Sequence, residues 1–278
     1  MKKIFQIIGL ISLTCFSFFM TEKTALVVSD MDEIMIQIKN EKDKFATEPI
    51  DAVIENNTII PGINGRKVNI NKSYKNMKIN GFYHENLYVY DYNKPKVSLV
   101  DNKDKYIIKG NTSKRVVSLI FKVSMNDDLD SILDIINNYN IKSTFFVEEL
   151  WFENNKDKAK EIIKEGHNIG ILTNDYTTSS FELINITLKD MNHKTNYCYQ
   201  EEENKNNIDV CKLKGNYTIM PTLISLTTPL ADIKNKIESG SLLSLKINPQ
   251  VKKELSTIII YIKSKGYKIT NLDENILE

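Results

Sequence analysis

The sequence predicts an α/β fold whose strands run parallel. Between residues 116 and 172, short apolar runs alternate with amphipathic segments of helical period. The runs are Val116–Phe121, Ser143–Val147 and His167–Leu172. Neighbouring parallel strands need a crossover connection, usually a helix, and strands buried on both faces are apolar throughout. Strand, helix, strand, helix, strand at this spacing therefore predicts a parallel sheet with helices on the outside.

Cap residues set the ends of the two predicted helices. Asp127 and Asp128 precede the first helix, where acidic side chains cap free N–H groups and suit the positive end of the helix dipole. Its apolar residues recur at helical spacing: Leu129, Ile132, Leu133, Ile135 and Ile136. The second helix closes with Ala159–Lys164 and ends at Gly166, a typical C-cap residue.

The first segment of the chain, residues 1–20, is predicted to target or anchor the protein. Lys2 and Lys3 precede the uncharged run Ile4–Met20, which is short for a membrane span of about 20 residues. No small-residue cleavage site follows, so an uncleaved signal anchor is favoured and a cleaved signal peptide is the alternative. Because basic flanks stay in the cytoplasm, we expect a single N-terminal span in the cell membrane with the domain outside, or secretion if the leader is cut.

Two segments separate this leader from the main sheet. Residues 21–47 are predicted to form a helical stalk, in which Ser29 can cap and the helix covers Ser29–Phe45. Residues 48–110 are predicted to be a β-rich accessory region with one or two helical turns at Ser73–Lys78. The β-prone pieces are Ala52–Ile54, Thr58–Ile60, Val68–Ile70, Leu87–Tyr92 and Tyr106–Ile108. Tyrosines crowd this region, and a half-buried strand face is favoured over a sugar-binding platform.

The main domain is predicted to cover residues 111–278. After residue 172, helical and strand patterns continue to alternate to the end of the chain. The helices are Phe181–Met191, Glu201–Lys214, Leu230–Glu238 and Val251–Lys265; the strands are Tyr197–Tyr199, Tyr217–Met220, Leu242–Ile247 and Tyr267–Leu272.

Short motifs in this domain resemble those of the polysaccharide deacetylase (NodB-homology) family. That family has A-T-F-F-V, G-H-E-I-G-N-H-[ST]-x-x-H, G-S-I-I-L-L-H-D and K-G-Y in this order. This chain has S-T-F-F-V at 143–147, G-H-N-I-G-I-L-T-N-D-Y at 166–176, G-S-L-L-S-L-K-I at 240–247 and K-G-Y at 265–267. The resemblance covers roughly residues 112–278, and it implies an irregular parallel α/β barrel.

The chain departs from the family at the residues that would carry the chemistry. The resemblance implies that the first Asp of T-F-D-D-G is the catalytic base and the second a metal ligand. It also implies that the two histidines of H-[ST]-x-x-H complete the metal site and that the late histidine of L-H-D is the general acid. These five positions hold Lys122, Val123, Leu172, Tyr176 and Lys246.

None of these replacements suits a zinc-type centre. Such cations need imidazole, thiolate or carboxylate donors, and metal-assisted hydrolysis needs the cation to activate water and polarise the carbonyl. Leu and Val offer no donor, and a cationic Lys repels a metal. Where the family has R-x-P-x-G, which braces the base, residues 196–200 read N-Y-C-Y-Q. We therefore predict a barrel without a catalytic centre, a metal or another cofactor.

Two acidic features keep other interpretations open. A shift of register could make Asp127 and Asp128 stand in for the lost Asp pair, but their position favours helix capping. The loop Thr173, Asn174, Asp175 and Tyr176 is a possible binding groove, and Asn174 with Asp175 leaves a weak non-catalytic metal site open.

Cys198 and Cys211 are the only cysteines outside the leader. In an oxidising exterior compartment, two cysteines with a short intervening segment favour a disulfide. Two separate buried thiols are the alternative.

Composition excludes one class of partner. With 37 basic and 36 acidic residues the formal net charge is +1, so nothing indicates nucleic-acid binding, which calls for a clustered basic surface. We expect an inactive deacetylase-like envelope protein that binds cell-wall glycan or an envelope protein partner through the former active-site groove. The alternatives are an active deacetylase with rearranged residues and a structural scaffold. A groove filled by Leu172, Val123 and Tyr176 would favour the scaffold.

Overall fold

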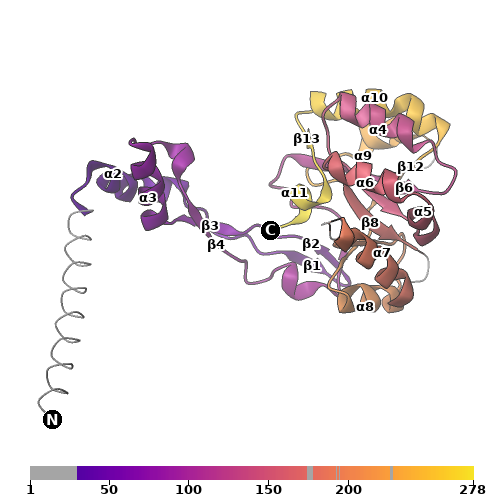
Figure 1. The fold of residues 1–278 in the computed structure, drawn as a ribbon, viewed down its shortest axis with the longest axis horizontal. Coiled ribbons are helices and arrows are strands. Elements are labelled where there is room, and N and C mark those ends of the chain that lie inside the picture. The colour runs from indigo at the N-terminus through magenta and orange to yellow at the C-terminus, as the bar shows by residue number, and fades with distance from the viewer. Residues whose placement is uncertain (1–29, 174–177, 192, 194, 226–227) are drawn as a thin grey trace, which may run out of the picture. The chain divides into compact units, whose positions relative to one another are not determined.

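The chain forms two compact units in the computed structural model, which describes residues 30–173, 178–191, 193, 195–225 and 228–278 (Figure 1). The small unit contains the described residues up to Pro49 together with Asn64–Asn93, and the large unit contains Ile50–Ile63 and Lys94–Glu278. Within these described ranges, no helix is long and apolar enough to cross a membrane. The predicted leader at residues 1–20 lies outside them.

The small unit is a helical pair beside a two-stranded sheet. Its elements are α2 (Glu33–Glu41), α3 (Ile70–Asn80), the antiparallel strands β3 (Gly65–Val68) and β4 (Tyr90–Asn93), and short 3-10 turns at Lys42–Phe45 and Glu85–Leu87. Ile38, Met77 and Tyr88 form its buried core. The Asp32 side chain caps α2 by accepting from the Ile34 N–H at 3.0 Å. The predicted cap, Ser29, lies outside the described residues.

The observed units differ from the predicted stalk and accessory region. Residues 50–63 belong to the large unit because β1 (Val53–Glu55) pairs with β2 (Thr58–Ile60), which joins the main sheet through β5 (Tyr106–Ile107). The predicted strand at 68–70 instead leads into α3, since the Asn69 side chain accepts from the Lys72 N–H at 2.9 Å and starts a helix there.

One curled sheet organises the large unit. Its strand order is β1-β2-β5-β10-β9-β8-β7-β6-β12-β11, and every pairing except β1 with β2 is parallel. The remaining strands are β6 (Val116–Val123), β7 (Thr144–Val147), β8 (Asn168–Leu172), β9 (Tyr197–Tyr199), β10 (Tyr217–Ile219), β11 (Leu223–Ser225), β12 (Leu242–Lys246) and β13 (Lys268–Ile269), the last pairing with the start of β6. Among the described strands β1 and β11 do not pair, so the irregular parallel barrel that the sequence predicts is a half-barrel with a curled sheet.

Within the described residues of the large unit, seven helices cover one face of this sheet. They are α4 (Leu129–Asn138), α5 (Glu149–Asn154), α6 (Lys156–Lys164), α7 (Thr178–Asp190), α8 (Lys205–Leu213), α9 (Pro229–Lys236) and α10 (Pro249–Ser264) (Figure 1). The parallel α/β order predicted from residues 116–172 is confirmed. The predicted helix at 201–214 begins only at Lys205, because the Asn204 side chain caps it by accepting from the Asn207 N–H at 3.2 Å.

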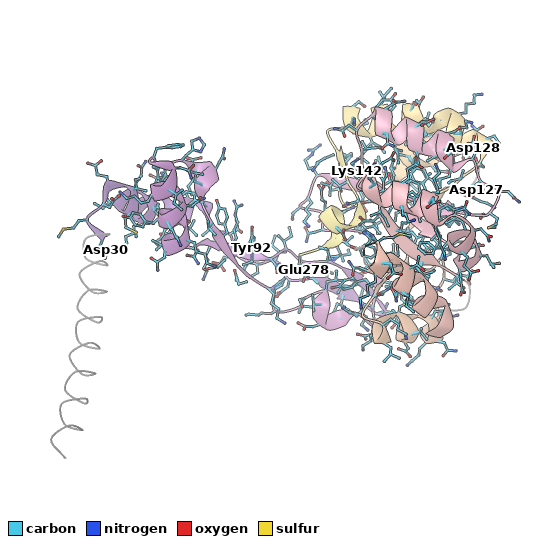
Figure 2. All side chains as sticks on the ribbon, viewed as in Figure 1. Asp30, Tyr92, Asp127, Asp128, Lys142 and Glu278 are labelled. Atoms are coloured by element: carbon cyan, nitrogen blue, oxygen red, sulfur yellow. A yellow bond between two sulfur atoms is a disulfide. The ribbon has the colours of Figure 1, made fainter. Side chains whose placement is uncertain are left out.

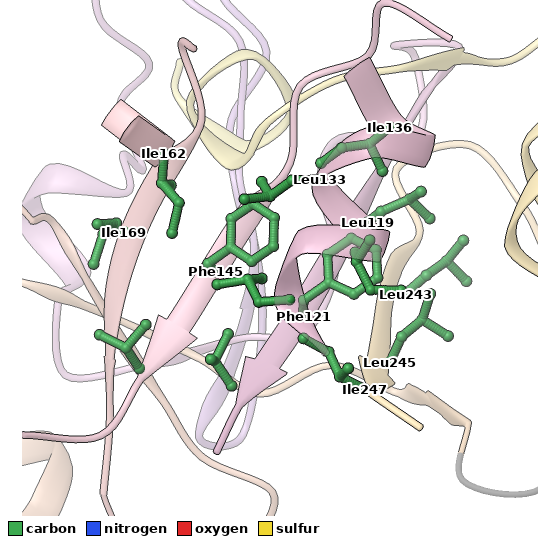
Figure 3. Packing of buried hydrophobic residues seen from close by; sticks show 14 of the residues in the cluster. Leu119, Phe121, Leu133, Ile136, Phe145, Ile162, Ile169, Leu243, Leu245 and Ile247 are labelled. Atoms are coloured by element: carbon green, nitrogen blue, oxygen red, sulfur yellow. The ribbon is translucent and has the colours of Figure 1, made fainter. Parts of the chain in front are cut away.

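Side chains of β6 alternate between the two faces of the sheet. Leu119, Phe121 and Val123 are fully buried in the core beneath the helices, where Phe121 stacks on Phe145 with ring centroids 5.4 Å apart (Figure 3). Ile120 lies in a second core on the opposite face. Because successive side chains on a strand point in opposite directions, Lys122 belongs to that opposite face and Val123 does not.

The opposite face is closed at one end by α11 (Leu272–Ile276), which the sequence did not predict. Leu272 and Ile276 pack into the second core, and the Leu272 N–H donates to Thr144 Oγ1 at 3.3 Å. Gly170 on β8 lies directly against Phe146, because a Cβ there would come within 2.3 Å of the ring. The absence of a side chain at residue 170 therefore lets the Phe146 ring fill this face.

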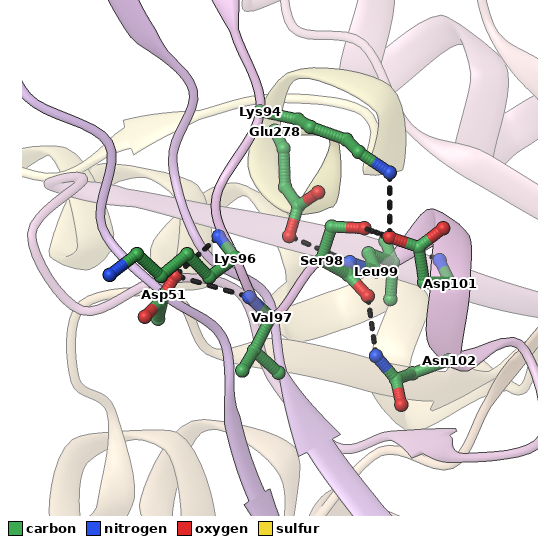
Figure 4. A network of polar contacts seen from close by, with 9 residues as sticks. All are labelled: Asp51, Lys94, Lys96, Val97, Ser98, Leu99, Asp101, Asn102 and Glu278. Carbon is green, nitrogen blue, oxygen red and sulfur yellow. Dashed lines mark hydrogen bonds and ion pairs between the residues drawn. The ribbon is translucent and has the colours of Figure 1, made fainter.

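A carboxylate network fixes the segment that leads into the main sheet (Figure 4). Glu278 accepts from the backbone N–H groups of Gly62 at 3.1 Å and Leu99 at 2.8 Å. Asp51 accepts from those of Lys96 at 2.7 Å and Val97 at 3.1 Å. These four donors have no partner in a regular ladder, so the carboxylates satisfy them and tie residues 94–102 to 50–63.

The structure contains the disulfide Cys198–Cys211, with Cα atoms 6.4 Å apart and a sequence separation of 13. Replacing both cysteines by serine should lower the free energy of unfolding by about 3 kcal/mol, since the cross-link restricts the unfolded chain. Urea unfolding of the two proteins measures this difference.

Reductant provides the control for this prediction. It should lower wild-type stability by a similar amount and leave the double-serine protein unchanged, whereas Cys15→Ser should behave as wild type. Equal wild-type stability with and without reductant would contradict a stabilising cross-link.

Candidate functional site

The carboxyl ends of five strands surround a cleft of about 860 Å³ in the large unit. It is lined by the ends of β6, β8 and β12 and by the connections that follow β7 and β9, the edge at which parallel α/β folds bind ligands. The lining residues are Lys122, Ser124, Glu148, Glu149, Leu150, Ile171, Leu172, Thr173, Ile184, Tyr199, Gln200, Glu201, Glu202, Glu203, Asn204 and Lys246.

Two lysines lie side by side on the floor of this cleft. Lys122 on β6 and Lys246 on β12 are register partners in a parallel pair, so their side chains leave the same face. The Lys122 side chain is 14 % exposed and forms an ion pair with Glu201. Its ammonium also lies 5.6 Å from the centre of the Tyr199 ring. Lys246 is exposed and has no carboxylate partner in the described part of the chain.

Tyr199 supplies a neutral phenol at the same floor. Its hydroxyl shares a 2.6 Å hydrogen bond with the Ser244 hydroxyl and donates to Glu201 at 3.4 Å. Burial raises the pKa of Tyr199 above its ordinary value, and the nearby Glu201 charge acts in the same direction. The hydroxyl therefore stays protonated at neutral pH and serves as a hydrogen-bonding group rather than as a base.

The walls of the cleft are acidic and partly apolar. Five glutamates, Glu148, Glu149, Glu201, Glu202 and Glu203, line it against the two lysines. One of the five, Glu203, accepts from the Asn57 side chain at 2.8 Å. Leu150 on α5 is 63 % exposed and gives the rim an apolar contact. The cleft thus offers charged, hydrogen-bonding and apolar groups within one open space.

The residues at the positions where the polysaccharide deacetylase family has its metal site do not fit a metal. Val123 is fully buried in the core beneath the helices and does not line the cleft. Leu172 lines the cleft without a donor atom, and Lys122 contributes a cation. Among the described residues, no group of three or more His, Cys, Asp or Glu side chains is placed to hold a metal ion. The loop positions Asn174, Asp175 and Tyr176 lie outside those residues.

Asp128 caps α4, whereas the Asp127 side chain closes the turn before the helix, and neither residue lines the cleft. Asp127 accepts from the Ser124 N–H at 2.6 Å, and Asp128 accepts from the Ser131 N–H at 3.3 Å at the start of α4 (Figure 2). Asp128 also binds Lys252 on α10 at 2.5 Å. These contacts fix the helix start, so the structure gives no support to the two residues as substitutes for a catalytic pair.

Residues 109–235 match the family model of polysaccharide deacetylases. This segment of the chain is similar to that family. A curated relative, the uncharacterized protein YlxY of Bacillus subtilis, is 29 % identical over 278 residues that cover 92 % of this chain and 87 % of the relative. The likeness to YlxY therefore extends beyond the matched domain.

Solved structures share the fold of this chain. A family 4 carbohydrate esterase pseudoenzyme of Bacillus anthracis has a TM-score of 0.66 and 24 % identity, covering 88 % of this chain and 95 % of that chain. PdaA of Bacillus subtilis, a family 4 carbohydrate esterase, has a TM-score of 0.54 and 15 % identity, covering 82 % and 97 %. At these identities the likeness concerns the fold.

His167, the histidine at the position of the G-H-E-I-G motif, is structural. It is 1 % exposed; its Nδ1 accepts from the Ser143 N–H at 3.2 Å, and its Nε2 lies 3.2 Å from Asn137 Oδ1. These bonds join β7 to α4 and leave the ring neutral. Burial and, to a smaller extent, the Lys142 charge lower the pKa of His167 to about 4.

The sequence motifs did not reveal several cleft residues. Glu201 follows the altered N-Y-C-Y-Q segment, and its role depends on a partner, Lys122, that is distant in sequence. Glu148 and Glu149 follow S-T-F-F-V and read locally as the start of a helix. The signal that the sequence offered was a charge opposite in sign to Lys122 shortly after another predicted strand, Tyr197–Tyr199.

The stability of this protein should fall at acid pH through His167. The folded pKa of about 4 lies below the ordinary 6.5, so the unfolded state binds the proton more readily. The contribution of the neutral ring is complete above about pH 6.5 and is lost as the pH falls toward 4, by at most about 3 kcal/mol. Chemical unfolding between pH 4 and pH 7 measures this loss.

His167→Gln should weaken this acid dependence, because the titrating ring is removed. His84→Gln, which changes an exposed histidine, is the matched control and should keep the wild-type profile. A His167→Gln profile parallel to that of wild type would contradict the assignment.

Proposed function

We propose that this protein is a catalytically inactive member of the polysaccharide deacetylase family. It binds cell-envelope glycan through the cleft at the strand ends. The observation that carries the proposal is an open cleft of about 860 Å³ whose floor holds Lys122, Leu172 and Lys246 where a deacetylase would need a base, a ligand and an acid. An open site without its chemistry is suited to binding rather than to turnover.

The charges on the floor argue against hydrolysis with rearranged residues. Removing an acetyl group requires an activated water and stabilisation of the developing oxyanion. Lys122 is held by Glu201, and the Tyr199 phenol is neutral, so neither residue is poised to take a proton from water. The B. anthracis protein of similar fold is a pseudoenzyme, and a mutant of it has restored enzymatic activity. This fold can therefore lose its chemistry and keep its architecture.

Glycan is favoured as the ligand by the composition of the cleft. Sugars present hydroxyl groups to polar side chains and C–H faces to apolar ones, and the cleft offers both in Lys246, Glu149 and Leu150. The open cleft also argues against a pure scaffold, because Val123 packs in the core instead of filling it. An envelope protein partner is the alternative occupant.

An extracytoplasmic location is part of this proposal. The buried disulfide Cys198–Cys211 suits an oxidising compartment, and the apolar run Ile4–Met20 suits export or anchoring. Both features favour the cell membrane with the domain outside, or secretion if the leader is cut.

Metal-free full-length protein, kept in detergent, should show no one-to-one zinc site of micromolar or tighter affinity. The reason is that Lys122, Val123 and Leu172 supply no donor set. Calorimetric titration measures this, with a metal-binding member of the family as the positive control. A stoichiometric micromolar site would contradict the inactive assignment and call for a deacetylase assay.

Soluble cell-wall oligosaccharides should bind the full-length protein, and Lys246→Ala or Leu150→Ala should weaken that binding about 5-fold or more, the loss expected for one polar or apolar contact. Calorimetry measures the affinities. Leu213→Ala, which truncates an 81 % exposed leucine that does not line the cleft, is the matched control.

Two results would count against glycan binding through the cleft. Absence of binding to any oligosaccharide tested would shift the proposal to the protein partner. Binding that all three variants keep unchanged would place the glycan elsewhere on the protein.

A further inference from the structure

The small unit exposes apolar side chains close to where the described chain begins. Met31 and Ile79 are each 76 % exposed, Phe82 is 54 % exposed and Ile36 is 46 % exposed. We call these four residues the amino-end patch. Single exposed apolar residues are common on protein surfaces, so the argument depends on whether these four lie together.

An ion pair brings the members of the amino-end patch together. Lys78, in the last turn of α3, binds Asp32, the cap of α2, at 2.7 Å. Met31 precedes this aspartate and Ile79 follows this lysine in the chain. Phe82 follows the end of α3, and Ile36 lies one helical turn after Asp32. Met31 and Ile79 are thus chain neighbours of the two residues of the ion pair that joins the start of α2 to the end of α3, and Ile36 and Phe82 lie four residues away from Asp32 and Lys78 in the chain.

The core of the small unit does not need these four side chains. On α2 the buried residues are Met35 and Ile38, and on α3 the buried apolar residue is Met77. Ile79 lies two positions after Met77, about 200° around the helix, and points away from the core, whereas Ile36 lies between Met35 and Ile38 and stays 46 % exposed. Both helices therefore have apolar side chains on their exposed faces as well as in the core. Such exposed apolar side chains are typical of a surface that contacts another apolar surface.

The segment that precedes the amino-end patch in the chain indicates which apolar surface the patch contacts. Residues 21–29 connect Met31 and the helices to the uncharged run Ile4–Met20, and they reach at most about 30 Å when fully extended. If the run lies in a bilayer, the patch is held within that distance of the lipid surface. At such effective concentrations, a few apolar side chains suffice for contact.

We propose that the amino-end patch docks on the lipid bilayer into which the preceding apolar run inserts. Met, Ile and Phe are side chains that enter the boundary between headgroups and acyl chains. The Asp32–Lys78 pair neutralises the charges at the centre of the patch, so no unpaired charge of that pair has to approach the lipid. The small unit then lies on the membrane surface, independently of what the cleft binds.

The test uses full-length protein reconstituted into vesicles of phosphatidylcholine and phosphatidylglycerol with brominated acyl chains. An indole is introduced by Ile79→Trp, and the matched control is Leu213→Trp, at an 81 % exposed leucine of the large unit. The native Trp151 is only 3 % exposed, and its signal is subtracted with wild-type protein. Phe82→Trp repeats the test should Ile79→Trp fold poorly.

The Ile79→Trp indole should be quenched by brominated lipid at least about 3-fold more than the Leu213→Trp indole, with blue-shifted emission. Equal quenching at both positions overturns the proposal. A blue shift that occurs without quenching and increases with protein concentration also overturns the proposal. Such a result would indicate a second copy of the protein as the occupant of the patch. Failure of the full chain to stay in the vesicles after carbonate extraction removes its premise and overturns it as well.

Discussion

The alternation of side chains along β6 is the constraint on which the large unit depends. This strand is hydrogen-bonded to β7 and β12 along its length and to β13 at its start. Its odd-numbered residues from Leu119 to Val123 anchor the helices, and its even-numbered residues Ile120 and Lys122 supply the second core and the cleft floor. A shift of one residue along β6 would move Lys122 into an apolar core. The register of this strand therefore determines both the packing of the core and the side chains that line the cleft.

Electrostatics explains how a lysine is accommodated on the floor of the cleft. A lysine on a strand that is buried over most of its length requires a partner, and Glu201 provides one across the end of the sheet. The ring of Tyr199 lies beneath the same ammonium, and the tyrosine hydroxyl is satisfied by Ser244. The cleft floor is thereby a closed set of paired groups, apart from Lys246, which stays accessible to a ligand.

Local patterns in the sequence were sufficient for the parallel α/β order, because apolar runs and cap residues are short-range signals. Asp128, Gly166 and the strand at Tyr197–Tyr199 all have the places that these signals indicate. Unit boundaries were not predictable, since the pairing of β2 with β5 joins segments whose contact leaves no local trace. The sequence did not predict α11 for the same reason, because this short helix is defined by its burial against the sheet.

Sequence motifs also located the ends of the strands that form the cleft, but not its contents. Replacement of the expected donors was evident from Lys122 and Leu172 alone. The structure was needed to show that Val123 faces the helices, because this depends on the side-chain alternation continuing to the last residue of β6. The glutamates of the cleft come from two connections whose positions only the tertiary structure determines.

The disulfide has one more consequence for recognition. Cys198 lies on β9 before the connection that lines the cleft, and Cys211 lies on α8 after it, so Glu201, Glu202 and Glu203 belong to a covalent ring. Both ends of this ring are buried in the helix-covered core. Its conformational freedom is therefore restricted before any ligand arrives, and a ligand that contacts this wall loses less binding free energy to ordering it.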